Sequence, residues 1–177
     1  MDSLRGQLLL AGAGLHDPNF RRTVVLIAEH SDEGAMGVVL NRPAEVSVSE
    51  AAPELSVLVE PEEPVYIGGP VEPQAVLVLA EFDEPEDSAS LVIDDIGFLP
   101  AETDVAPATR RARVFAGYAG WSAGQLEAEL EEDAWILEPA LAEDVFAQGD
   151  DLWGDVLRRK GGQFAVLALM PPDLSLN

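Results

Sequence analysis

The stretch RVFAGYAGWSAGQLEAEL, residues 113–130, decides the fold, because it changes from an apolar run through a glycine-rich segment into a helical pattern. Val114 and Phe115 suit a buried, pleated strand. Three glycines allow backbone conformations that other residues avoid: Gly117, Gly120 and Gly124. Glycine between two periodic segments favours a sharp turn. The order therefore predicts a strand, a tight turn and then a helix.

The start of this helix carries a capping pattern. Ser122 stands three residues before Gln125, the spacing of a capping box, in which the hydroxyl accepts from the Gln125 N–H and the Gln125 side chain reaches back. Trp121 and Leu126 flank the box as a hydrophobic staple would. The pattern predicts that Ser122 caps an amphipathic helix whose acidic side, including Glu129, faces solvent.

The same residues also match the nucleophile elbow of serine hydrolases, because Gly120, Ser122 and Gly124 have its spacing. In that fold the histidine base follows the serine, whereas His16 and His30, the only two histidines, precede it. A convergent site with either histidine stays open, because triads are defined by geometry rather than by chain order. The sequence favours the capping role and keeps a serine hydrolase using Ser122 as an alternative.

Length and composition predict one domain over residues 1–177. The chain is 47% hydrophobic and long enough to bury a substantial core. It contains no cysteine, which excludes disulfides and thiolate chemistry. No apolar run is long enough to span a bilayer, and the first residues lack the pattern of a secretory signal, so we expect a cytoplasmic protein.

The formal net charge of -23 bears on possible partners. A strongly negative field opposes contact with phosphate backbones, which disfavours direct nucleic-acid binding. The acidic run from 81 to 90 lacks the spacing of a calcium loop and reads as a solvated loop. We expect no metal, no cofactor and no membrane contact, and an unidentified protein or small molecule as partner.

Apolar runs separated by turn residues predict many short strands. Their expected positions are 7–11, 23–28, 35–40, 65–67, 75–80, 91–93, 96–99, 134–137 and 164–169. The second and third should form a hairpin with a polar tip at 30–34, and Pro43 should end its ladder. Short helices are expected near 50–55 with Ser47 as cap, at 141–146, and from Asp150 or Asp151 to the basic run before Gly161. Strands interrupted by a few helices predict an α+β fold with a mixed, strongly curved sheet.

Long motifs stand in a fixed order along the chain. They are GQLLLAGAGLHDPNFRRTVVLIAEH (6–30), GAMGVVLNRP (34–43), VYIGGPV (65–71), RVFAGYAGWSAGQLEAEL (113–130) with AWIL (134–137), and PPDLSLN (171–177). Together they resemble the YqgE/AlgH family of bacterial proteins. The resemblance implies an α+β fold with a bifurcated sheet closed into a pseudo-barrel.

The function favoured by these observations is that of a non-enzymatic cytoplasmic binding protein. Its candidate binding residues are Asp17, Asn19, Arg22, Asn41, Arg42, Gly68, Gly69, Tyr118, Trp121 and Gln125. Each also has a structural interpretation as a turn, a cap, an ion pair or a backbone requirement. A transcriptional regulator is a further alternative, although the chain has no helix-turn-helix, zinc finger or basic helix.

Three segments are expected to converge into one site. They are the loop from Asp17 to Arg22, the hairpin end at Asn41 and Arg42, and the turn from Gly117 to Gln125, each at the end of an apolar strand where loops carry function. Arg42 is the strongest candidate. Its guanidinium can pair with Asp17, or it can present a fork to an acidic ligand.

Overall fold

A computed structural model describes residues 3–13, 15, 20–100, 107–149 and 151–169 of the chain. The strands are β1 (Gln7–Ala11), β2 (Val24–Ser31), β3 (Gly34–Val39), β4 (Pro43–Ser47), β5 (Pro64–Ile67), β6 (Val71–Phe82), β7 (Ser90–Ile93), β8 (Ile96–Phe98), β9 (Thr109–Ser122) and β10 (Trp135–Pro139). The α-helices are α1 (Val48–Ala51), α2 (Gln125–Glu131), α3 (Ala142–Val145), α4 (Leu152–Lys160) and α5 (Gln163–Leu167), and 3-10 turns occupy Pro53–Leu58 and Pro85–Asp87. The α+β class expected from the sequence is confirmed.

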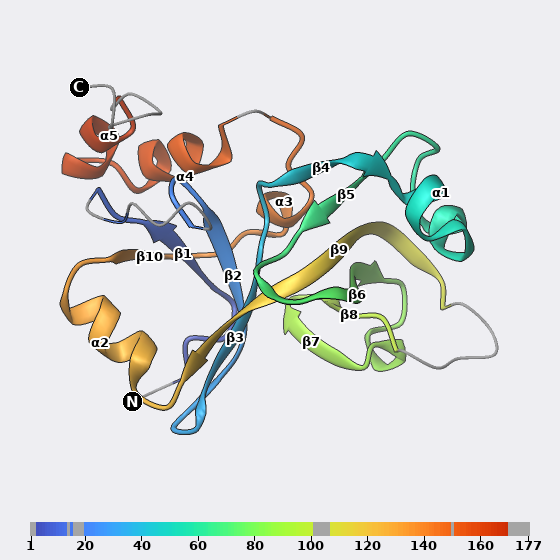
Figure 1. Cartoon of the computed structure of the whole chain (residues 1–177), viewed down its shortest axis with the longest axis horizontal. Coiled ribbons are helices and arrows are strands. Elements are labelled where there is room, and N and C mark those ends of the chain that lie inside the picture. The colour runs from blue at the N-terminus through green and yellow to red at the C-terminus, as the bar shows by residue number, and fades with distance from the viewer. Residues whose placement is uncertain (1–2, 14, 16–19, 101–106, 150, 170–177) are drawn as a thin grey trace.

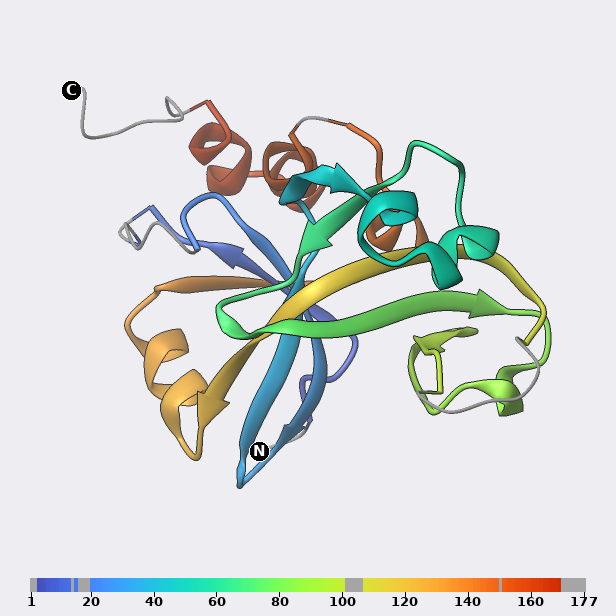
Figure 2. The same cartoon turned by 45° about the vertical axis from the view of Figure 1, so that its right-hand side comes forward.

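Strand β9 is the longest strand and the spine of the sheet (Figure 1). Of its 14 residues, those from Thr109 to Tyr118 form an antiparallel ladder with β6 along one edge, and Figure 2 shows the two strands running side by side. The other edge is divided, because β5 pairs parallel with Phe115 and Ala116 whereas β3 pairs antiparallel with the end of the strand. The sheet is therefore bifurcated at β9, and it is mixed because of the single parallel pairing.

The strand order is β10-β1-β2-β3-β9-β6-β8-β7, and β4 pairs with β5 off this path. Both ends of this order are free of further ladders among the described residues. The sheet is strongly curved but open, which corrects the expected closure into a pseudo-barrel. Between β9 and β10 the contact is made by side chains and by α2, as described below for Trp121 and Trp135.

Gly68 and Gly69 allow β5 and β3 to share one edge of β9. A Cβ on Gly68 would lie 2.3 Å from the carbonyl oxygen of Gly117, and one on Gly69 would lie 2.2 Å from the carbonyl carbon of Tyr118. Gly69 also has a φ of 155°, which other residues rarely adopt. The turn after β5 thus lies against the backbone of β9, and the Val39 N–H donates to the Gly68 carbonyl at 2.8 Å, joining β3 to the same turn.

The main core lies between the sheet and the helices α2, α3, α4 and α5. Leu8, Leu9 and Leu10 of β1 are all fully buried, so this strand is covered on both faces. Trp153 of α4 is nearly buried, and its indole N–H donates to the carbonyl of Ala11 at 2.9 Å. None of the described helices is long and apolar enough to cross a membrane.

The central stretch differs from its prediction at the turn. Gly117 lies inside β9, which continues to Ser122, and only Ala123 and Gly124 separate strand from helix. The N-cap of α2 is Gly124, with a φ of 78°. The side chain of Gln125 accepts from the Ser122 N–H at 3.0 Å, but the Ser122 hydroxyl donates to the same oxygen instead of capping the helix. Ser122 is therefore the last strand residue, and half of the capping box is formed.

Other predictions hold or fail for local reasons. The segment predicted as a last strand is helix α5, because a short apolar run has no period that separates strand from helix. Pro43 begins strand β4 at an edge, where its missing N–H costs no ladder bond. The caps at Ser47 and Asp151 are confirmed, since both side chains accept from a backbone N–H three residues ahead.

A single buried cation joins β9 to two other segments. Arg113 is only 1% exposed, and its guanidinium lies 4.1 Å from the centre of the Tyr66 ring. It donates to Glu63 at 3.2 Å and to the carbonyl of Ala147 at 2.8 Å. Because buried charge is costly unless it is fully bonded, this arrangement fixes the segments before β5 and before α4 against β9.

We expect Arg113→Met to lower the free energy of unfolding by about 3 to 5 kcal/mol, because it leaves the Glu63 carboxylate and buried carbonyls without their donor. Urea denaturation followed by circular dichroism measures this. Arg110→Met is the matched control, since Arg110 pairs with Asp83 and Asp95 at the surface, where loss costs about 1 kcal/mol or less. Equal urea midpoints for the two variants would contradict the role of Arg113.

Candidate functional site

The first group of predicted residues lies where β2 begins. The Asn41 amide donates to the carbonyl of Arg22 at 2.9 Å and accepts from the N–H of Val24 at 3.0 Å. Through these two bonds the Asn41 side chain extends the β2–β3 ladder beyond its last backbone pair. Arg22 has a φ of 56°, and its guanidinium lies 4.3 Å from the centre of the Trp153 ring and 3.5 Å from Asp151. Asn41 and Arg22 therefore hold the loop before β2 to the sheet and to α4.

Arg42 lies beside this group. Its guanidinium donates to the carbonyl of Arg21 at 2.7 Å. Burial lowers the pKa of Arg42 from its ordinary value, and the nearby charge of Arg21 lowers it further. Asp17 and Asn19 lie outside the described residues, and so does the predicted pairing of Arg42 with Asp17.

The second group surrounds Gly117. Gly68 and Gly69 serve the backbone contact with β9 and present no side chain to a ligand. The Tyr118 hydroxyl donates to Glu72 at 2.9 Å across the β6–β9 pair. This bond raises the pKa of Tyr118, because it stabilises the protonated phenol, and desolvation and the Glu72 charge act in the same direction.

Ser122 and His30 do not form a catalytic pair in this sheet. His30 is opposite Ala35, and Ala35 is opposite Trp121, so these three side chains share one face. Ser122 is one residue further along β9 and points to the other face. The His30 Nδ1 accepts from the Leu4 N–H at 2.9 Å. His16, the second histidine, lies outside the described residues.

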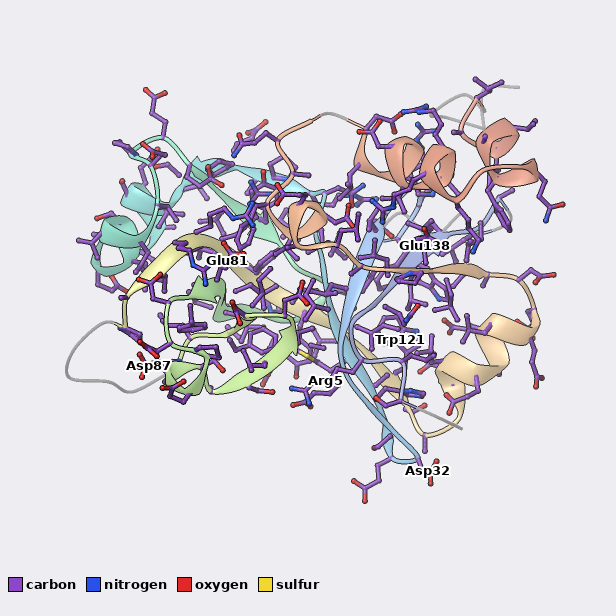
Figure 3. The ribbon with its side chains drawn as sticks, turned by 180° about the vertical axis from the view of Figure 1, so that it is seen from behind. Arg5, Asp32, Glu81, Asp87, Trp121 and Glu138 are labelled. Atoms are coloured by element: carbon purple, nitrogen blue, oxygen red, sulfur yellow. The ribbon has the colours of Figure 1, made fainter. Side chains whose placement is uncertain are left out.

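The third group is built around one carboxylate. Glu129 of α2 accepts through Oε1 from the indole N–H of Trp121 at 3.0 Å and from that of Trp135 at 2.8 Å. Its Oε2 accepts from the Gln125 amide at 3.0 Å. The two indole rings meet edge to face at 6.1 Å, and Phe20 meets Trp135 in the same way at 5.7 Å. Trp121 lies beside α2 in Figure 3.

These residues line a cavity of about 470 Å³ between β9, α2 and β10, which we call the tryptophan pocket. Its lining is Leu15, Phe20, Gly120, Trp121, Gln125, Glu129, Glu132, Asp133, Ala134 and Trp135. The volume falls in the range of small-molecule sites, which are mostly apolar with a few placed polar groups. Glu132 and Asp133 are exposed at its rim.

The residues predicted to form a single site lie in two places, near opposite ends of β3. Trp121 pairs with Ala35 near the start of β3, whereas Arg42 follows the end of that strand. The residues between them advance about 3.3 Å each along the chain, which places the two ends roughly 20 Å apart. Arg22, Asn41 and Arg42 converge at one end, and Trp121 and Gln125 converge at the other.

Sequence reasoning missed the centre of the tryptophan pocket. Glu129 was expected on the solvent face of α2, but it follows Gln125 by one helical turn and therefore lies on the same side. Phe20 and Trp135 were not proposed as site residues. An available signal was the pair of tryptophans flanking a helix, because a buried indole N–H needs an acceptor.

The fold and the pocket define an α+β protein with an open, bifurcated sheet and an aromatic-lined cavity beside α2. The sequence profile of the AlgH-like family (DUF179) matches residues 8–165, and the chain belongs to this family. The resemblance of the motifs to the YqgE/AlgH family is thereby confirmed.

Bacterial relatives are similar over almost the whole chain. The UPF0301 protein of Thermobifida fusca (strain YX) is 45% identical over 190 residues, which cover 99% of this chain and 96% of the relative. That of Mycobacterium avium (strain 104) is 41% identical over 181 residues, covering 97% and 90%.

Two solved structures have the same fold. A crystal structure of a Corynebacterium diphtheriae protein has a TM-score of 0.86 at 31% identity and covers 96% of this chain and 93% of that one. The solution structure of the AlgH protein from Pseudomonas aeruginosa has a TM-score of 0.72 at 30% identity, with coverages of 96% and 95%.

The tyrosines give a direct test of the second group. Both titrate above the ordinary phenol pKa, Tyr118 mainly through Glu72 and Tyr66 mainly through burial. We expect Glu72→Gln to lower the pKa of Tyr118, because a neutral amide is a weaker acceptor than a carboxylate. Ultraviolet titration of the tyrosinate band in a Tyr66→Phe background measures Tyr118 alone. An unchanged curve would contradict the Tyr118–Glu72 bond.

Proposed function

We propose that the chain is a non-enzymatic binding protein of the cytoplasm and that the tryptophan pocket is its binding site. The observation that carries this proposal is the shared acceptor at Glu129, which holds Trp121 and Trp135 in fixed orientations. Rings that are positioned before binding lose little conformational freedom when a ligand arrives. Rigid aromatic surface beside a cavity is typical of recognition sites.

The arrangement of polar groups supports binding over catalysis. A nucleophile needs a base within hydrogen-bond reach. Ser122 has its hydroxyl bonded to Gln125, and His30 points to the other face of the sheet. The pocket itself is lined by carboxylates, an amide and apolar groups, without serine, threonine or histidine in its described lining.

The ion pairs that the arginines form with carboxylates support a partner other than nucleic acid. Contacts to phosphates require cations that can leave their present partners. Arg111 bonds Glu81 and Glu143, Arg113 bonds Glu63, and Arg159 bonds Asp144. With these cations held by carboxylates and a net charge of -23, a regulator that binds DNA directly is the weaker alternative.

Ligand binding at the tryptophan pocket can be followed in a Trp153→Phe background. Trp153 is a buried residue of α4 that donates to the Ala11 carbonyl, so its replacement leaves the two pocket indoles as the only tryptophan fluorophores. We expect a panel of small organic cations, anions and neutral molecules to contain ligands that change this fluorescence and raise the melting temperature, because binding to the folded state stabilises it.

The control is Trp135→Phe, which keeps an aromatic ring but removes one donor to Glu129. We expect this variant to weaken binding of every ligand found. The proposal is wrong if no member of the panel changes either signal, or if Trp135→Phe and Trp135→Ala variants that remain folded by circular dichroism bind the ligands as tightly as the protein that keeps Trp135.

The hydrolase alternative has its own test. We expect a fluorophosphonate probe to leave the purified protein unlabelled, because His30, the one histidine among the described residues, lies on the other face of the sheet from Ser122. Labelling is read by mass spectrometry, with Ser56→Ala as a control for a surface hydroxyl. Labelling that disappears in Ser122→Ala and persists in Ser56→Ala would overturn the non-enzymatic proposal.

A further inference from the structure

Glu129 differs from the other carboxylates that are withdrawn from solvent. Among the described residues, each other carboxylate that is buried or half-buried lies within 4 Å of an arginine, a lysine or a histidine. These carboxylates are Glu63, Glu81, Asp95, Glu127, Glu138, Asp144 and Asp151. Glu129 is half-buried and has three neutral donors, two indole N–H groups and one amide.

Neutral donors satisfy the oxygens of a carboxylate but do not cancel its charge. The described lining of the tryptophan pocket adds two more acids, Glu132 and Asp133, and contains no lysine or arginine. An uncompensated negative charge in a partly desolvated site attracts cations more strongly than the same charge in water. The described lining of the pocket therefore carries negative charge without a positively charged partner.

The aromatic rings restrict the class of cation that suits the tryptophan pocket. Phe20, Trp121 and Trp135 line the same cavity as Glu129, and the face of an aromatic ring attracts a cation through its quadrupole. A metal ion would need oxygen ligands, whereas both oxygens of Glu129 already accept hydrogen bonds. No group of carboxylates and histidines suited to a metal occurs among the described residues.

A guanidinium or a primary ammonium brings N–H donors, and the acceptors open to them are the rim carboxylates of Glu132 and Asp133, which are exposed, so these cations gain less from the aromatic lining than a methylated one does. A methylated ammonium spreads its charge over carbon–hydrogen surface and needs no acceptor. Such cations are typically bound by aromatic rings.

We propose that the tryptophan pocket binds a methylated, preferably quaternary, ammonium group. This inference rests on the proposed function, since it assigns a ligand class to the same site. The half-buried ring of Phe20, with the small exposed parts of Trp121 and Trp135, contacts the methyl groups, and the charge of Glu129 with that of the rim acids supplies the counter-charge. The ammonium can belong to a free small molecule or to a methylated lysine of a protein partner.

The decisive comparison is between choline and its neutral isostere 3,3-dimethyl-1-butanol, which has the same shape without the charge. Isothermal titration of the wild-type protein should show choline binding about tenfold or more tightly, a ratio that corresponds to about 1.4 kcal/mol. Choline binding should weaken as salt is raised, because the rim acids contribute through solvent. A trimethyllysine peptide and free trimethyllysine, titrated in parallel, distinguish a protein partner from a small molecule.

Glu129→Gln tests the counter-charge. Glutamine keeps an oxygen that accepts from both indoles, so the variant should reduce choline affinity severalfold and leave the isostere unchanged. Glu131→Gln is the matched control, because Glu131 lies on the same helix but does not line the pocket. If Glu129→Gln does not fold, the double variant Glu132→Gln, Asp133→Asn tests the same charge at the rim.

The outcomes separate this inference from the proposed function. Equal affinities for choline and its isostere, both lost in Trp135→Ala, would reject the cation while keeping a binding pocket. Choline affinity that is unchanged in Glu129→Gln would also reject it. If neither probe binds and the panel described above yields no ligand, both the ammonium inference and the proposed function are wrong.

Discussion

The structure depends on one close contact, that of the Gly68–Gly69 turn with the backbone of Gly117 and Tyr118. Side chains at these glycines would place a Cβ within 2.3 Å of β9 backbone atoms. Because the turn can approach so closely, β5 and β3 share one edge of β9 and the sheet divides. The division directs the β3 side of the sheet toward α2 and β10, where the tryptophan pocket forms, and the β5 side toward Arg113.

Apolar periodicity was sufficient to predict most of this fold. The runs at 7–11, 65–67 and 91–93 became β1, β5 and β7 with changes of at most one residue at an end. Periodicity failed where an apolar run was short, because the neighbouring residues then decide between strand and helix. Phe164 is an example, since it lies in α5 after two glycines with positive φ. Closure of the sheet could not be predicted either, because it depends on which strand edges meet in space.

The site was predictable only in part, and the reason is physical. Trp121 and Gln125 were proposed because they belong to an unusual local pattern, and the structure places both side chains against Glu129. Glu129 was read as solvent-facing, since its role depends on Trp135, which reaches α2 from the far edge of the sheet. Arg42 was proposed because a cation at a strand end suggests a ligand, and in the structure its guanidinium donates to the Arg21 carbonyl at the other end of β3 from Trp121.

Negative charge alone would make this protein attractive to any cation, so selectivity must come from geometry. At the surface the excess acids are exposed and screened by salt, and they discriminate poorly among cations. Elsewhere in the described fold the cations hold segments together, as Arg113 does with Glu63 and Arg159 with Asp144. Glu129 is different because two indoles and an amide, instead of cations, satisfy its oxygens, and the same three residues line the cavity. Glu129 thereby keeps its negative charge beside aromatic rings, and these rings can discriminate among cations by their shape.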